Sequence, residues 1–222
     1  MTLTFDPLAD MDELELQFGR FEALRLERGT GLHTPQAGVS GWSAAQHLYH
    51  IALATDLAFR NVKSLVARRG RLIVDEDGPS KLARAVLEGG GPGRGAAEAP
   101  RIVRPPETVD PSFLEMELAQ NRAVLGELRG MAEEIPRAPM RIPHQDLGPL
   151  SAVEWLHFAR LHARHHLLIV EGSWSLWTPP DLQHPRPLLL PRTAPTRRWI
   201  GCLSNPRGRK SGASPPGVRR ES

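Results

Sequence analysis

The sequence predicts an all-α protein: a four-helix bundle with a long crossover between the second and third helices, followed by a disordered C-terminal tail. Three observations support this fold class. Apolar residues recur at helical spacing in four segments, strand patterns are nearly absent, and each segment begins at a recognisable capping residue. An up-down-down-up or an up-down order of the helices accounts for these segments and their connections.

The first two expected helices lie in the N-terminal third of the chain. The first begins at Asp10, carries apolar residues three and four positions apart, and ends at Gly29. The second begins with Ser43-x-x-Gln46, a capping box whose two side chains bind backbone N–H groups that a first helical turn leaves unpaired. We expect this second helix to continue to about Arg69.

The other two expected helices follow the crossover. The third is expected over Phe113–Glu134, after a cap at Asp110 and a proline at the first helical position. The fourth begins with a second capping box, formed by Ser151 and Glu154, and is expected to run to about Ser173. This last segment holds most of the residues that point to a function.

The connection between the second and third helices spans about residues 70–109, which is long for a compact domain. It is either partly ordered by packing across one end of the bundle or mobile. Residues Lys81–Leu87 have the pattern of a short helix. The glycine run at 89–95 lacks the Lys-Ser/Thr pair of a phosphate-binding loop, and we interpret it as a flexible linker.

Charge and composition divide the chain into two parts. The sequence pI is about 9.6, but residues 181–222 hold nine Lys and Arg against two Asp and Glu, a net charge of +7. Because the whole chain carries +3, residues 1–180 carry −4. We therefore expect a bundle domain over residues 8–178 and a Pro/Arg-rich disordered tail over 181–222. Specific nucleic-acid binding is not expected from such a tail.

Cysteine usage and hydropathy indicate a cytoplasmic protein. The single cysteine, Cys202, excludes a disulfide within one chain, which suits a reducing compartment. No apolar run is long enough to span a bilayer, and the N-terminal residues lack the pattern of a secretory signal. We expect no membrane insertion.

A pair of histidines in the fourth helix points to a metal ion. A helix turns once in about 3.6 residues, so His162 and His166 project from one face, one turn apart. Neutral imidazole nitrogens in this arrangement can converge on one divalent ion. His50, on the core-facing stripe of the second helix, is a credible third ligand. On spacing alone, a metal site and a set of hydrogen-bonded histidines are equally good interpretations.

The other polar and aromatic candidates have simpler interpretations. His47 lies on the same side of the second helix as His50, one turn nearer its end, where water has easier access. Glu154 is interpreted as a capping carboxylate, and Trp42 and Trp155 as packing residues at the rim of the core. His157 is expected to be peripheral, and His165 to be hydrogen-bonded or partly exposed. His144 and Asp146 lie in the loop before the fourth helix. Of these two, His144 is a candidate hydrogen-bond donor at the mouth of the site.

Several of these motifs together resemble the DinB/YfiT-like superfamily of bacterial metal-binding four-helix bundles. The resemblance covers about residues 11–174 and keeps the order of the motifs. The segments that carry it are Trp42-Ser43, His50, Arg94–Pro100, His144–Ser151 and Leu161-His162-x-x-His165-His166.

The resemblance implies a site and a range of functions. It implies that His50, His162 and His166 form the metal triad, that the ion is nickel or zinc, and that water completes its shell. Similar proteins include S-transferases and isomerases that use a low-molecular-weight thiol, so we expect a metal-dependent thiol transferase or a hydrolase acting on a small-molecule substrate, and a homodimer. The alternative is a non-catalytic metal-binding or stress-associated protein. The residues themselves identify no catalytic group and no cofactor-binding motif.

Overall fold

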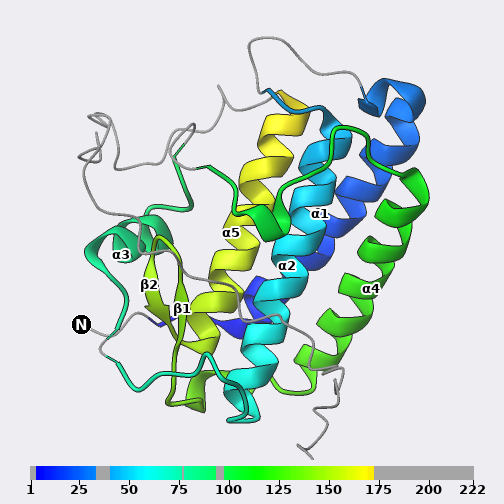
Figure 1. Cartoon of the computed structure of the whole chain (residues 1–222). Coiled ribbons are helices and arrows are strands. Elements are labelled where there is room, and N and C mark those ends of the chain that lie inside the picture. Colours follow the sequence, from blue (N-terminus) through cyan, green and yellow to red (C-terminus); the bar gives the residue numbers. More distant parts are fainter. Residues whose placement is uncertain (1–3, 34–40, 77, 94–97, 173–222) are drawn as a thin grey trace, which may run out of the picture. The chain divides into compact units, whose positions relative to one another are not determined.

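The computed structural model describes residues 4–33, 41–76, 78–93 and 98–172, which are mainly helical (Figure 1). The expected tail at 181–222 and Cys202 lie outside these residues. Helices α4 and α5 each pack against both α1 and α2, so every long helix contacts two others. The long helices are α1 (Pro7–Arg28), α2 (Ala44–Val66), α4 (Pro111–Arg129) and α5 (Ala152–Glu171).

Two of the predicted helix starts are capping boxes, and the structure confirms both. The Ser43 hydroxyl accepts from the backbone N–H of Gln46, whose side chain accepts from the N–H of Ser43. Ser151 and Glu154 make the same reciprocal pair at the start of α5. These caps fix where α2 and α5 begin, and therefore which turn of each helix carries a histidine.

The predicted start of the first helix was wrong. Helix α1 begins at Pro7, and its N-cap is Asp6, whose carboxylate accepts from the backbone N–H groups of Leu8 and Ala9. Asp10 is instead buried within the first turn of the helix. A capping residue followed by proline at the first helical position is the stronger start signal, and it stood four residues earlier.

The predicted helix ends were also too late in three cases. Helix α2 ends at Val66, and α4 ends at Arg129, after which the chain forms turns and the short 3₁₀ helix η3 (Ile135–Arg137). Helix α5 ends at Glu171, where Gly172 adopts the left-handed conformation with φ 72°. Glycine takes this conformation without the steric penalty that a Cβ would impose, so it ends the helix.

A small antiparallel sheet, not predicted from the sequence, precedes α5. Strands β1 (Ile142–His144) and β2 (Gly148–Leu150) pair so that Pro143 lies opposite Pro149. Proline has no N–H to give to a ladder and normally argues against a strand, which is why the pattern was missed. The hairpin lies beside the first turns of α5 (Figure 1) and places His144 next to that helix.

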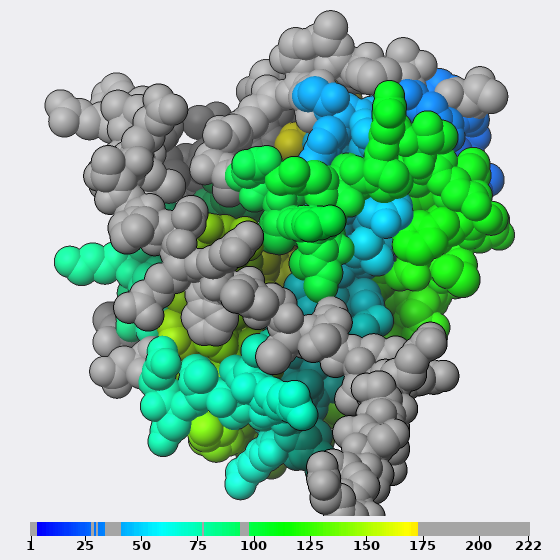
Figure 2. Space-filling model, viewed as in Figure 1, coloured from blue at the N-terminus to red at the C-terminus, as the bar shows by residue number. Residues whose placement is uncertain are grey.

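The crossover between α2 and α4 is partly ordered. It contains α3 (Lys81–Glu88), close to the predicted short helix, and the 3₁₀ helix η2 (Arg101–Val103), which packs against α2. Gly91, with φ 130°, lies where an added Cβ would meet the backbone oxygen of Leu161 at 3.5 Å. In Figure 2, atoms of the crossover and of α4 (green) cover part of α2 (cyan) on the face shown.

The core lies between the four long helices and is apolar. Its largest fully buried side chains include Phe18 and Phe21 of α1, Phe59 of α2, and Leu125 and Leu128 of α4. Burying side chains of this size stabilises the fold by about 1.5–3 kcal/mol each. None of the helices in the described part of the chain has both the length and the apolar character needed to cross a membrane.

Candidate metal centre

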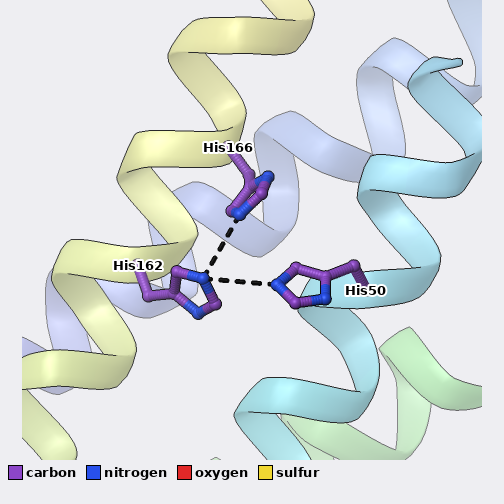
Figure 3. A group of neighbouring side chains, drawn as sticks. All are labelled: His50, His162 and His166. Atoms are coloured by element: carbon purple, nitrogen blue, oxygen red, sulfur yellow. Dashed lines mark hydrogen bonds between the residues drawn. The ribbon is translucent and has the colours of Figure 1, made fainter. Parts of the chain in front are cut away.

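The structure brings His50, His162 and His166 together between α2 and α5. In Figure 3, His50 projects from α2 toward the two histidines of α5. The Nε2 atom of His162 lies 3.3 Å from Nε2 of His50 and 3.2 Å from Nε2 of His166. One nitrogen from each ring lies within 4.8 Å of the other two, and the three residues are buried or half-buried.

These distances suit a shared cation. An ion bound at about 2.1 Å by tetrahedrally arranged nitrogens separates neighbouring nitrogens by about 3.4 Å, close to the two separations from Nε2 of His162, and the third pair lies within 4.8 Å. Imidazole nitrogens are ligands that zinc and nickel accept well. The donor set therefore fits a divalent ion of the kind that the family resemblance implies.

The proton positions also favour a cation between the rings. Nδ1 of His50 lies 2.9 Å from the carbonyl oxygen of Val103, which can only accept, so Nδ1 carries the hydrogen. Nε2 of His50 is then unprotonated, and its lone pair is directed at His162. A neutral His162 ring has at most one hydrogen on Nε2 to share between the two other rings, whereas a metal ion binds all three lone pairs at once.

Burial keeps these imidazoles neutral. It holds the pKa of His162 and of His166 well below the usual value of 6.5, and the neighbouring histidines lower both further. Burial also lowers the pKa of His50, and the hydrogen bond to Val103 partly offsets that effect. Neutral rings are the form that binds a metal, so the site needs no deprotonation at pH 7.

Two residues near the cluster differ from their sequence interpretation. His47 is not close to water: only 4% of it is exposed, and its ring lies 5.0 Å from that of His166. Trp42 lies within the cluster as well as at the start of α2, with its ring 5.3 Å from His50 and 5.4 Å from His47. Helical spacing places His47 and His50, three residues apart, on the same side of α2, and Trp42 lies just before the N-cap Ser43.

Two contacts of the cluster were missed in the sequence. Phe158 stacks on His162, with ring centroids 5.2 Å apart and an interplanar angle of 16°. It precedes His162 by four residues on α5, so helical spacing alone is a signal for it. The backbone carbonyl of Val103, which orients His50, has no side-chain signal, because it comes from the crossover.

The remaining candidates lie outside the triad. His144 packs against Trp155 and Phe158, and its Nδ1 accepts from the backbone N–H groups of Asp146 and Leu147. Its Nε2 therefore carries the hydrogen, which leaves His144 able to donate. Asp146 itself is exposed and accepts from Gln145.

His157 is buried and belongs to a separate cluster. Its Nδ1 lies 2.9 Å from the carboxylate of Asp10, which also pairs with Arg160 at 2.8 Å. The ring stacks on Phe5. His157 is outside the triad, as the sequence interpretation expected. That interpretation did not include the pairing of His157 with Asp10, which joins α5 to α1.

Trp155 and Glu154 have structural roles at the start of α5. Trp155 is buried and donates from Nε1 to the carbonyl of Ile142. Glu154 caps α5 and pairs with Arg141 at 2.6 Å. His165 is half-buried, with its ring 4.9 Å from that of His166. None of these side chains belongs to the group of nitrogens that converges on His162.

Comparison with protein families identifies the chain. The family model of the DinB superfamily matches residues 16–170, well over half of the sequence. The chain belongs to the DinB superfamily. Neither the comparison with curated proteins nor that with solved structures gave a match. The matched range includes α2, most of α1 and nearly all of α5, and with them all three histidines of the cluster.

The metal-free DinB-superfamily protein is expected to lose stability as the pH falls below about 6.5. Burial lowers the pKa of His47 to about 4 in the folded chain, whereas an unfolded histidine titrates near 6.5. Between these values the unfolded chain binds a proton that the folded chain does not, so unfolding becomes more favourable. The stability contribution is present above pH 6.5 and is lost as the pH falls toward 4.

Urea unfolding of chelator-treated protein at pH 7.5, 6.5 and 5.5 measures this effect. The urea midpoint is expected to fall slightly from pH 7.5 to 6.5, where an unfolded histidine is half protonated, and more steeply from 6.5 to 5.5. His50, His162 and His166 shift in the same direction and add to the fall. A midpoint that rises between pH 6.5 and 5.5 contradicts the burial of neutral imidazoles.

Proposed function

We propose that this protein binds one divalent metal ion, nickel or zinc, through Nε2 of His50, His162 and His166. The observation that carries the proposal is the convergence of three buried or half-buried, neutral imidazoles from two separate helices. Membership of the DinB superfamily supports it. Burying such groups without a shared ligand would be costly, so the arrangement favours a bound cation.

The ligand number favours a site that can take a further molecule. Among the described residues, the cluster that can hold an ion consists of three histidines. Structural zinc sites usually have four protein ligands, whereas catalytic sites have three and keep a position open. We therefore favour an enzyme, a metal-dependent thiol S-transferase or a hydrolase with a small-molecule substrate, over a non-catalytic metal-binding or stress-associated protein.

The residues around the triad have defined parts in such a site. The bound ion would supply a Lewis acid that acidifies water or attracts a thiolate, since three neutral ligands leave its charge uncompensated. Val103 fixes the ring of His50, and Phe158 packs flat on His162 and shields it from solvent on that side. His144 holds a hydrogen on Nε2 and is our candidate donor to a molecule bound at the open side.

We further propose that residues 8–178 form the functional domain, as an up-down-down-up bundle. Side-chain pairs between helices support this order. Asp10 pairs with His157 and Arg20 with Glu171, which favours a parallel α1 and α5. Helices α2 and α5 run in opposite directions in this order. The pairing of His47 with His166 and of His50 with His162 supports that arrangement.

Elemental analysis followed by activity assays tests the function. We expect purified protein to carry about one nickel or zinc ion per chain, and the ion to be removed by a chelator. Assays with low-molecular-weight thiols and electrophilic acceptors are expected to show conjugation that disappears with the ion and returns when it is added back. Stoichiometric metal without thiol transfer or hydrolysis favours the non-catalytic alternative, and absence of metal contradicts the proposal.

A further inference from the structure

A fourth imidazole, that of His47, lies behind the triad. It precedes His50 by three residues on α2, so the first turns of this helix carry both rings toward α5. His47 is buried, with 4% of its surface exposed, and its ring lies against those of Trp42 and His166. It is not one of the three residues whose nitrogens converge.

The contact between His47 and His166 constrains where their hydrogens lie. Their Nδ1 atoms are 2.8 Å apart, a distance at which one nitrogen donates and the other accepts. Two nitrogens at this separation share one hydrogen. The Nε2 atom of His166 lies on the other side of the ring, 3.2 Å from Nε2 of His162.

Coordination decides which of the two nitrogens donates. A neutral imidazole that binds a metal through Nε2 must keep its hydrogen on Nδ1. His166 then donates to His47, and His47 carries its own hydrogen on Nε2. That Nε2 atom is buried and has no hydrogen-bond partner among the described residues, so within them the His47 ring has one hydrogen bond, the one with His166.

His50 provides an internal comparison. Its Nδ1 donates to the carbonyl of Val103, and a carbonyl can only accept, so the hydrogen of His50 is fixed on Nδ1. An imidazole acceptor is different, because it can also donate. If Nδ1–H of His47 instead donates to Nδ1 of His166, the hydrogen of the neutral His166 ring lies on Nε2. That nitrogen then cannot bind a metal. The His47–His166 pair therefore has one ligating and one non-ligating arrangement.

We propose that His47 is a positioning residue that holds His166 in the Nδ1–H tautomer and aims its Nε2 at the metal. This inference rests on the proposed metal site. Groups that hydrogen-bond the second nitrogen of a ligating histidine set its tautomer and ring orientation, and their loss typically weakens metal binding by about 10- to 100-fold. His47 has this place for His166, as the Val103 carbonyl has for His50.

Three variants test the role of His47 through zinc affinity. His47→Leu removes the acceptor and keeps an apolar side chain, and we expect the dissociation constant for Zn²⁺, measured by chelator competition, to rise about 10- to 100-fold. His47→Asn keeps an acceptor oxygen close to the position of Nδ1 and is expected to restore most of the affinity. His33→Leu removes an exposed imidazole of η1 (Gly29–His33) and is expected to change nothing.

Imidazole nitrogen NMR of the zinc-loaded full-length protein reads the tautomers directly. We expect His166 to be protonated on Nδ1 and bound through Nε2, and His47 to be protonated on Nε2 with no metal bound. This readout does not depend on whether a variant folds. The tautomer of His47 separates positioning from general packing, because only a hydrogen bond accepted from His166 by Nδ1 requires the hydrogen of His47 to lie on Nε2.

The outcomes separate this inference from the proposed function. Equal zinc affinity in the wild type and His47→Leu, or a His47 protonated on Nδ1 in the zinc-loaded protein, overturns the positioning role and leaves the metal site intact. Direct coordination of His47 to zinc also overturns it, since His47 would then be a ligand. A wild-type protein that binds no zinc or nickel overturns both.

Discussion

Replacing His162 by alanine is expected to reduce bound metal from about one ion per chain to background. His162 is the central residue of the cluster, because its Nε2 is within 3.3 Å of the nitrogens of both other histidines. Two ligands on different helices, without the third, leave an ion too weakly held to survive purification. Elemental analysis of the purified variant measures the loss.

The same variant is expected to lose the stabilisation that metal gives the wild type. A ligand present at about 1,000 times its dissociation constant stabilises a folded protein by about 4 kcal/mol. Adding zinc to chelator-treated protein should therefore raise the melting temperature of the wild type but not that of His162→Ala. Comparing each protein with and without metal removes the effect of the cavity left by the substitution.

Two further variants make this result interpretable. His162→Gln fills more of the space and is expected to lose metal as well, so a folding defect in the alanine variant is not the explanation. His33→Ala removes an exposed histidine and should keep about one ion. Stoichiometric metal in both His162 variants contradicts the assignment of the triad.

Replacing Glu154 by alanine is expected to reduce the free energy of unfolding by about 3 kcal/mol. Glu154 is 3% exposed, caps α5 at Ser151, and pairs with Arg141 at 2.6 Å. Removing one member of a buried ion pair leaves the other charge without compensation. The urea dependence of unfolding, monitored by circular dichroism, measures the change.

Two comparisons separate the contributions of Glu154. Glu154→Gln preserves the capping box, which accepts Gln at this position, but removes the charge, and we expect a smaller loss. Glu127→Ala breaks an exposed pair with Lys63 and should cost less than about 1 kcal/mol. A Glu154→Ala variant no less stable than Glu127→Ala contradicts the importance of the buried pair.

The parts of the fold that local chemistry determines were predictable from the sequence. The starts of α2, α4 and α5 follow from Ser43, Asp110 and Ser151, whose side chains bind the N–H groups of the first turn. Helix ends were less predictable, because α4 stops at Arg129 although apolar residues continue. The hairpin before α5 was not predictable, since it depends on a tertiary position beside that helix and pairs two prolines.

The candidate site was predictable where its residues share a helix or a family motif. Helical spacing was enough to place His162 and His166 on one face and to make His50 a candidate third ligand, and the family resemblance implied that the three form one triad. Contacts that come from folding were not accessible: the Val103 carbonyl lies in the crossover, 53 residues from His50. The burial of His47 was missed for the same reason, because it depends on α5 packing over the first turns of α2.

Anomalous X-ray diffraction from crystals of the metal-loaded protein, collected at the zinc or nickel absorption edge, tests the central claim most directly. We predict a single anomalous peak between α2 and α5, within about 2.0–2.3 Å of the Nε2 atoms of His50, His162 and His166. A peak bound by other side chains, or the absence of a peak between these three rings in protein that retains metal, would contradict the account.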